Sequence, residues 1–146
     1  MARRSVNSER NAVERCGICG CELNRDGEYA KPTIKGRGHA TKHHYVAERF
    51  FGRSMNRPRT RRPAIFEANP WTISPGAGVF CYECHEELLH NPVLLPEDVQ
   101  LLKQLVELRG LCETEKPASR DRLAGRIELL HEAIALGLKQ LLNRQR

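Results

Sequence analysis

The chain of 146 residues has about the length of one domain. Hydrophobic residues make up 40% of it and charged residues 29%, which excludes collagen, a coiled-coil fibre and wholesale disorder. Its 24 Lys and Arg exceed its 18 Asp and Glu, giving a net charge of +6, and no apolar run is long enough to cross a membrane.

The first twelve residues are polar, and we expect residues 1–12 to form a flexible basic arm ahead of the folded part. They lack the apolar stretch of a signal peptide, so we expect the protein to be cytoplasmic. The reducing cytoplasm keeps thiols free, and the six cysteines of the chain are therefore interpreted as candidate metal ligands rather than disulfides.

Two Cys-x-x-Cys pairs stand far apart in the chain, and each has the spacing of a zinc knuckle. They are Cys16 with Cys19, and Cys81 with Cys84. Four thiolates supplied two at a time complete the tetrahedral shell of a structural Zn²⁺ and leave no open position for catalysis. Cys21 could take the place of Cys19 or be a free thiol. Cys112 lies in a Leu-rich stretch, where we expect a small buried side chain.

The positive charge is concentrated between the two pairs, because residues 31–63 hold ten basic residues against one acid. Arginine suits bidentate contacts to phosphate, so this segment predicts binding to DNA, with RNA as the other nucleic acid it could bind. A solvated surface loop is the alternative. The candidate contacts are Lys42, Arg53, Arg57, Arg59, Arg61 and Arg62.

Short strands are expected at residues 28–34 and 39–46. The second contains His43 and His44, and neighbours in a strand point to opposite faces, so one can bind a metal while the other faces elsewhere. A helix is expected at residues 83–90, and its His85 would be held in place by the preceding Cys84.

The last third, residues 96–146, predicts a helical hairpin. One helix begins at Pro96 and stops near Gly110, and Ser119 can cap the next. The second helix carries an apolar stripe that could cover its neighbour, the zinc core or a second copy, which would make a homodimer. The stripe consists of Leu123, Ile127, Leu130, Ile134, Leu138 and Leu141.

Taken in order, the first cysteine pair, the His43-His44 strand and the run from Cys81 to His85 resemble the HNH endonucleases. The resemblance covers about residues 16–95. It implies an α+β fold: a ββα-metal finger at residues 13–95, with the Arg-rich loop 53–63 inserted, followed by the pair of helices. It also implies that the knuckles hold a structural zinc.

The resemblance further implies the role of each histidine in metal-dependent phosphodiester hydrolysis. His43 would bind a catalytic divalent ion such as Mg²⁺ or Mn²⁺, His44 would be the general base, and His85 would be the ligand from the helix. His90, five residues later, would add a ligand to that ion or simply end the helix.

The chain departs from the family where an asparagine usually orients the base, because residues 72–80 contain none. Asn69 is the nearest candidate for that role. The absence favours the alternative function, a non-catalytic zinc-finger module that binds nucleic acid. A third class is an interaction protein whose helical tail is the working surface.

Overall fold

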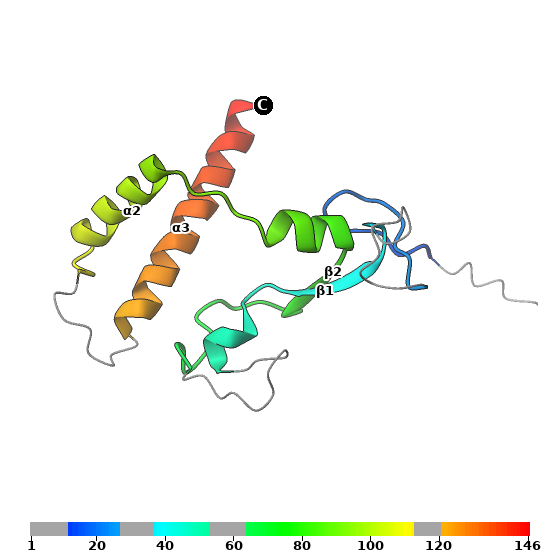
Figure 1. The fold of residues 1–146 in the computed structure, drawn as a ribbon, viewed down its shortest axis with the longest axis horizontal. Coiled ribbons are helices and arrows are strands. Elements are labelled where there is room, and N and C mark those ends of the chain that lie inside the picture. The colour runs from blue at the N-terminus through cyan, green and yellow to red at the C-terminus, as the bar shows by residue number, and fades with distance from the viewer. Residues whose placement is uncertain (1–11, 27–36, 53–63, 113–120) are drawn as a thin grey trace, which may run out of the picture. The chain divides into compact units, whose positions relative to one another are not determined.

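The computed structural model describes residues 12–26, 37–52, 64–112 and 121–146. A two-stranded sheet and several helices make the described chain a mixed α+β protein, as the sequence predicts (Figure 1). The elements are strand β1 (Ala40–His44), 3₁₀ helix η1 (Glu48–Phe51), strand β2 (Ala77–Cys81), π-helix η2 (Glu83–Leu89), and helices α2 (Pro96–Leu108) and α3 (Asp121–Arg144).

The chain divides into two compact units. The first unit comprises Met1–Tyr45 and Pro75–Pro92, and it contains both cysteine pairs together with β1, β2 and η2. The second unit comprises Val46–Ser74 and Val93–Arg146. The segment that follows β1 therefore groups with the C-terminal helices. The domain expected at residues 13–95 stays a prediction.

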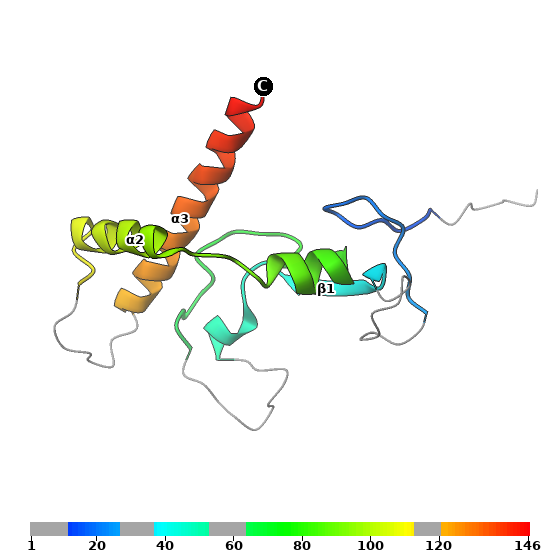
Figure 2. The same ribbon diagram turned by 45° about the horizontal axis from the view of Figure 1, so that its top comes forward.

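Strands β1 and β2 form an antiparallel pair, with Ala40 opposite Cys81 and His43 opposite Gly78. Helix η2 follows β2 after a single residue and packs on both strands, and Figure 2 shows it running along them. Its hydrogen bonds are of the π type, which join residues five apart instead of four. The sheet and the helix together position the side chains described below.

A small hairpin carries the first cysteine pair. Arg15 pairs with Glu22 across it, and the turn between them uses Gly20 in the left-handed region at φ 74°. The hairpin is joined to the sheet because the backbone of Asn24 bonds to residues on either side of His39. Cys16, Phe80, Cys81 and Cys84 form the buried core at this junction.

Most of the expected elements in the described chain are confirmed. The strand at 39–46 is found as Ala40–His44, the helix at 83–90 as Glu83–Leu89, and the helix expected from Pro96 as Pro96–Leu108. The chain then turns at Gly110, where φ is 66°. The expected strand at 28–34 and the cap at Ser119 lie outside the described residues.

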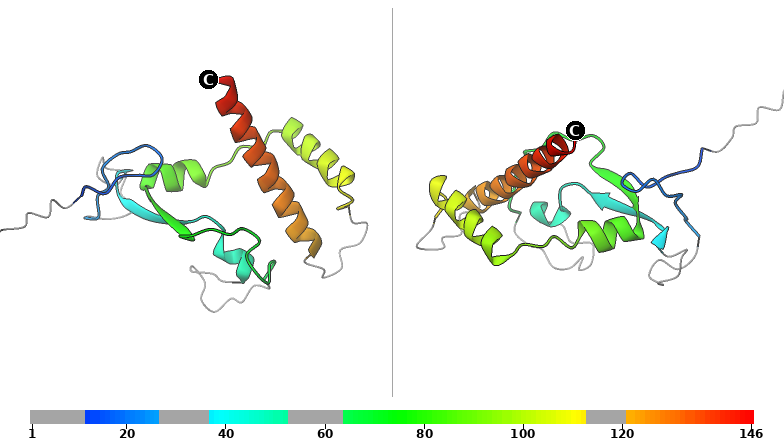
Figure 3. Two further views of the ribbon diagram at one scale, coloured as in Figure 1. Left: turned by 180° about the vertical axis from the view of Figure 1, so that it is seen from behind. Right: turned by 90° about the horizontal axis from the view of Figure 1, so that it is seen from above.

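In the second unit, α2 and α3 pack beside each other (Figure 3). Leu129 is the buried residue of α3, and the Leu111 side chain fits against Gly125. The C-terminal half of the α3 stripe is not covered by the described part of the chain, because Ile134 and Leu138 are 53% and 60% exposed, and pairing with a second copy stays a prediction. Helix α2 has 13 residues and α3 has 24, so α2 is too short to pack along the whole length of α3.

Aromatic side chains hold the irregular part of the second unit together. The Phe66 ring lies 5.8 Å from Phe50 and 5.5 Å from Trp71, and Trp71 lies 5.4 Å from His131 on α3. These contacts place His131 in an ordinary edge-on packing role, away from metal chemistry. Among the residues described, none of the helices combines the length and the apolar character that crossing a membrane requires.

Gly78 on β2 leaves room for two aromatic rings, and this generates a prediction about stability. A Cβ at position 78 would lie 2.9 Å from the buried Phe80 ring and would collide with the Tyr45 hydroxyl. We expect Gly78→Ala to lower the free energy of unfolding by about 1–2 kcal/mol, measured by denaturant titration of the zinc-loaded protein. Gly76→Ala is the matched control, because nothing lies within 4 Å of the added Cβ. Equal stability of the two variants would contradict the prediction.

Candidate metal centres

Four cysteine sulfurs from two distant parts of the chain converge in the first unit. Cys16 and Cys19 come from the hairpin, Cys81 ends β2, and Cys84 lies in the first turn of η2. Their sulfur atoms all lie within 4.8 Å of one another, and Cys19 and Cys81 are 3.8 Å apart. Four thiolates at this separation could hold a metal ion such as zinc, as the sequence predicts.

The backbone around each cysteine pair is folded as a ligand loop. The N–H of Ile18 donates to the Cys16 sulfur at 3.5 Å, and the N–H of Cys84 donates to the Cys81 sulfur at 3.4 Å. Burial raises the pKa of Cys16, but hydrogen bonds from the backbone and from Cys19 outweigh burial and lower that pKa to about 6. Burial raises the pKa of Cys81 and Cys84, so their thiolates depend on a nearby cation.

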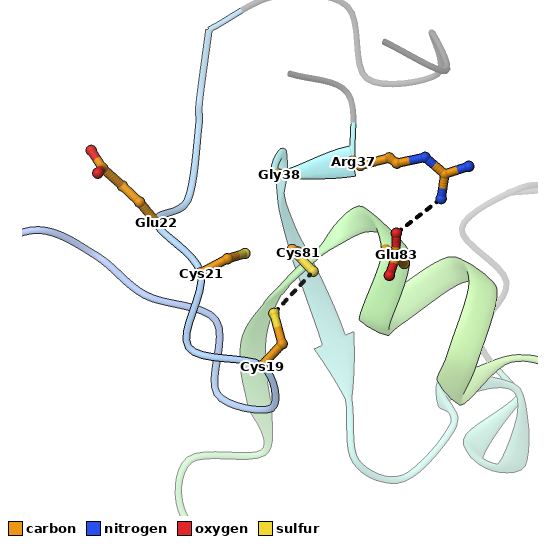
Figure 4. Close-up of a pocket in the computed structure, with 7 residues that line it drawn as sticks. All are labelled: Cys19, Cys21, Glu22, Arg37, Gly38, Cys81 and Glu83. Atoms are coloured by element: carbon orange, nitrogen blue, oxygen red, sulfur yellow. Dashed lines mark hydrogen bonds and ion pairs between the residues drawn. The ribbon is translucent and has the colours of Figure 1, made fainter. Parts of the chain in front are cut away.

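Cys21 lies beside this cluster but outside the group of four. It faces Cys19 and Cys81 across an open pocket, which Figure 4 shows. Burial raises its pKa to about 12, as burial also raises the pKa of Cys81 and Cys84. Because Cys19, and not Cys21, belongs to the group of four sulfurs within 4.8 Å of one another, the geometry favours Cys19 as the ligand. Cys112 is exposed, so the expectation that it is buried is wrong.

An ion-pair group on the rim of the same pocket joins β1 to η2. Arg37 precedes β1 and donates to Glu83 at 2.9 Å and to Glu87 at 2.6 Å, and its contact with Glu83 is drawn in Figure 4. Arg37 is one of the ten basic residues in the segment 31–63 that the sequence predicts to bind nucleic acid. Its charge is balanced within the unit and is not available in full to a polyanion.

Three histidines form a second cluster on the same strand and helix. His43 comes from the middle of β1, His85 from η2, and His90 from the residue that ends η2. One ring nitrogen of each lies within 4.8 Å of the others. The ring of His85 lies 5.0 Å from that of His43 and 4.5 Å from that of His90.

The π-helix explains why His85 and His90 come together. Five residues separate them, and in an α-helix this spacing is out of phase by one residue. The hydrogen bonds of η2 join residues five apart, and its turns are wider than those of an α-helix, so side chains at that spacing lie on the same side of the helix. Imidazoles that converge from a strand and a helix could hold a divalent ion of the transition series.

Hydrogen bonds orient two of the three rings. Nδ1 of the buried His85 lies 2.8 Å from the hydroxyl of Thr41, and that hydroxyl donates to the carbonyl of Phe80 at 2.9 Å. Nδ1 of His90 lies 3.2 Å from the carboxylate of Glu86. Burial lowers the pKa of His85, and burial together with the neighbouring His85 lowers the pKa of His43. Neutral imidazole is the form that binds a metal.

Thr41 and Glu86 were missed by the sequence reasoning, although their spacing carried a signal. Thr41 lies two residues before His43, so both side chains point to the same face of the strand. Glu86 lies four residues before His90, one turn away on the helical segment.

The remaining predicted site residues have these positions. His44 ends β1 opposite Ala77, and strand alternation puts its side chain on the other face from His43. Asn69 belongs to the second unit, and its side-chain oxygen accepts a hydrogen bond from the Trp71 N–H at 2.9 Å. Lys42 is exposed on β1. The predicted contacts Arg53, Arg57, Arg59, Arg61 and Arg62 lie outside the described residues.

Comparisons of the chain with protein-family models, with curated protein sequences and with solved structures find no match.

The cysteine geometry predicts one tightly bound zinc ion per chain. We expect Cys84→Ser to lose this zinc and to unfold the first unit, because three thiolates remain and a buried hydroxyl replaces the fourth. Cys21→Ser and Cys112→Ser are the matched controls and should keep one equivalent. The measurement is zinc content by mass spectrometry after gel filtration, together with circular dichroism. Loss of zinc from Cys21→Ser with retention in Cys19→Ser would reassign the fourth ligand.

Proposed function

We propose that the protein is a metal-dependent DNA endonuclease of the HNH type. The observation that carries the proposal is the convergence of ring nitrogens from His43, His85 and His90 beside a four-thiol cluster. Cys84 and His85 are neighbours in η2, so an ion held by the thiols would also hold the histidine cluster in place. The order of strand, strand and helix supports the same assignment.

The proposed chemistry is hydrolysis of a phosphodiester. His44 adjoins the histidine cluster in sequence and acts as the general base, taking a proton from a water molecule. The water oxygen forms a bond to phosphorus, the bond from phosphorus to the 3′ oxygen breaks, and the leaving oxygen takes up a proton from solvent. A divalent ion held by the three imidazoles would supply the positive charge that stabilises the phosphate oxygens.

Basic side chains would hold the DNA by its phosphates. Lys42 is exposed on β1, one residue from His43, and the five arginines of residues 53–63 are the other proposed contacts. Phosphate contacts of this kind position the backbone without reading its sequence. Binding should therefore weaken steeply as the salt concentration rises.

A second candidate is a zinc module that binds nucleic acid without cutting it. The observation that favours it concerns the residue that would orient the base. Residues 72–80 contain no asparagine, and the amide oxygen of Asn69 is used by the backbone of Trp71. Both candidates predict DNA binding, and only the first predicts cleavage.

Cleavage of supercoiled plasmid tests the proposal. We expect nicking by the zinc-loaded protein when Mg²⁺, Mn²⁺ or Ni²⁺ is added, and a rate about 10²–10⁴-fold lower for His44→Ala, because the general base is lost. His131→Ala is the matched control and should cut like the wild type, since His131 packs on Trp71 in the second unit. The readout is conversion of supercoiled to open-circular DNA on a gel.

The outcomes separate the two candidates. Equal cleavage by wild type and His44→Ala would contradict the role of His44 and indicate a contaminating nuclease. No cleavage with any of the ions, combined with salt-sensitive DNA binding, would favour the zinc module that does not cut.

A further inference from the structure

We infer that Thr41 is a positioning residue that fixes the tautomer of His85, so that His85 offers Nε2 to a divalent ion. The inference rests on the proposed function, because it concerns the histidine cluster assigned there. It adds a residue that does not touch the ion. Thr41 is 5% exposed and lies on the face of β1 that also carries His43.

The two hydrogen bonds of the Thr41 hydroxyl determine which ring nitrogen of His85 carries the proton. A hydroxyl has one proton, and that of Thr41 is donated to the Phe80 carbonyl at 2.9 Å. The oxygen can then only accept in its 2.8 Å contact with Nδ1 of His85. Nδ1 of His85 must carry the proton, and in a neutral imidazole this leaves the lone pair on Nε2.

Glu86 is the other acceptor near this ring, and it acts in the same direction. One of its carboxylate oxygens lies 3.5 Å from Nδ1 of His85, longer than the contact with Thr41. Its other oxygen lies 3.2 Å from Nδ1 of His90, which favours the same tautomer there. The rings of His43 and His90 lie 5.0 Å and 4.5 Å from that of His85, and His44 is a further titratable group that acts on it. The contact from Nδ1 of His85 to the Thr41 oxygen, at 2.8 Å, is thus shorter than its contact with Glu86, at 3.5 Å.

The burial of His85 increases the cost of losing its hydrogen bond to Thr41. His85 is 7% exposed, so water is a poor substitute for a lost acceptor. Without the Thr41 oxygen, Nδ1–H would be left without its closest partner, and the ring would shift toward the tautomer that protonates Nε2. Groups that fix a ligand histidine in this way typically contribute about 10–100-fold to metal affinity.

The first test measures the tautomer itself in the wild-type protein. Long-range ¹H–¹⁵N correlation spectra of the zinc-loaded protein at pH 8, with no second metal added, distinguish a protonated ring nitrogen from one with a free lone pair. We expect Nδ1 of His85 to be protonated and Nε2 to be free. A protonated Nε2 would overturn the inference whatever the function of the protein.

The second test measures metal affinity. Ni²⁺ is titrated calorimetrically into zinc-loaded protein, and His43→Ala shows which binding belongs to the histidine cluster. We expect Thr41→Val, which keeps the shape but removes the acceptor, to weaken Ni²⁺ binding about 10–100-fold. Thr41→Ser restores the hydroxyl and should bind close to the wild type. Zinc content before and after each titration reports that the first unit remains folded.

The results distinguish the inference from the function on which it rests. Wild-type protein without Ni²⁺ binding sensitive to His43→Ala would overturn the metal site of the proposed function, and the role of Thr41 with it. Wild-type binding that Thr41→Val leaves unchanged would overturn the role of Thr41 alone. If Thr41→Val fails to retain zinc, the wild-type tautomer and the Thr41→Ser affinity decide the question.

Discussion

The convergence of four cysteine sulfurs is the interaction on which the first unit depends. Of the described residues in this unit, the buried ones are three of those cysteines, Phe80, and the hydrogen-bonded pair of Thr41 and His85. So little buried apolar surface supplies only a small part of the free energy needed to order a hairpin, a sheet and a helix. A cation shared by the four thiolates would supply the rest, because binding energy at a structural metal site is folding energy.

The cysteine cluster and the histidine cluster are connected through residues that are adjacent in the sequence. Cys84 and His85 are consecutive in η2, and Cys81 follows Phe80, whose carbonyl accepts the Thr41 hydroxyl. The cysteine cluster is thus joined to the histidine cluster through a peptide bond at Cys84–His85 and through the hydrogen bonds of Thr41. If each cluster held an ion, the four thiolates would complete a tetrahedral shell, whereas the three imidazoles would leave positions for water or substrate, as a preorganised site requires. On the proposed function, the structural ion and the catalytic ion would share one small scaffold.

The second unit is built on a different principle. Of its described residues, the buried ones, Phe66 and Leu129, are apolar, and packed rings and two adjoining helices supply tertiary contacts. Ion pairs such as Arg109 with Glu132 lie on its surface, where each contributes less than about 1 kcal/mol. Ile134 and four leucines toward the end of α3 are exposed, so hydrophobic burial in the described part of this unit is incomplete within a single copy.

The sequence by itself determined the elements that have strong local signals. Cysteine spacing marked the four thiols, proline and glycine marked both ends of α2, and the alternation of a strand separated His43 from His44. Only the tertiary structure decided between Cys19 and Cys21, because both lie close to Cys16 in the sequence and only Cys19 belongs to the group of four sulfurs. It also brought His90 onto His85 through π-type hydrogen bonds, which no residue pattern announces, and it placed Thr41 behind His85. The choice of Cys19 and the position of Thr41 depend on contacts between segments distant in the sequence, and the approach of His90 depends on the backbone conformation of η2. Spacing along the chain encodes neither.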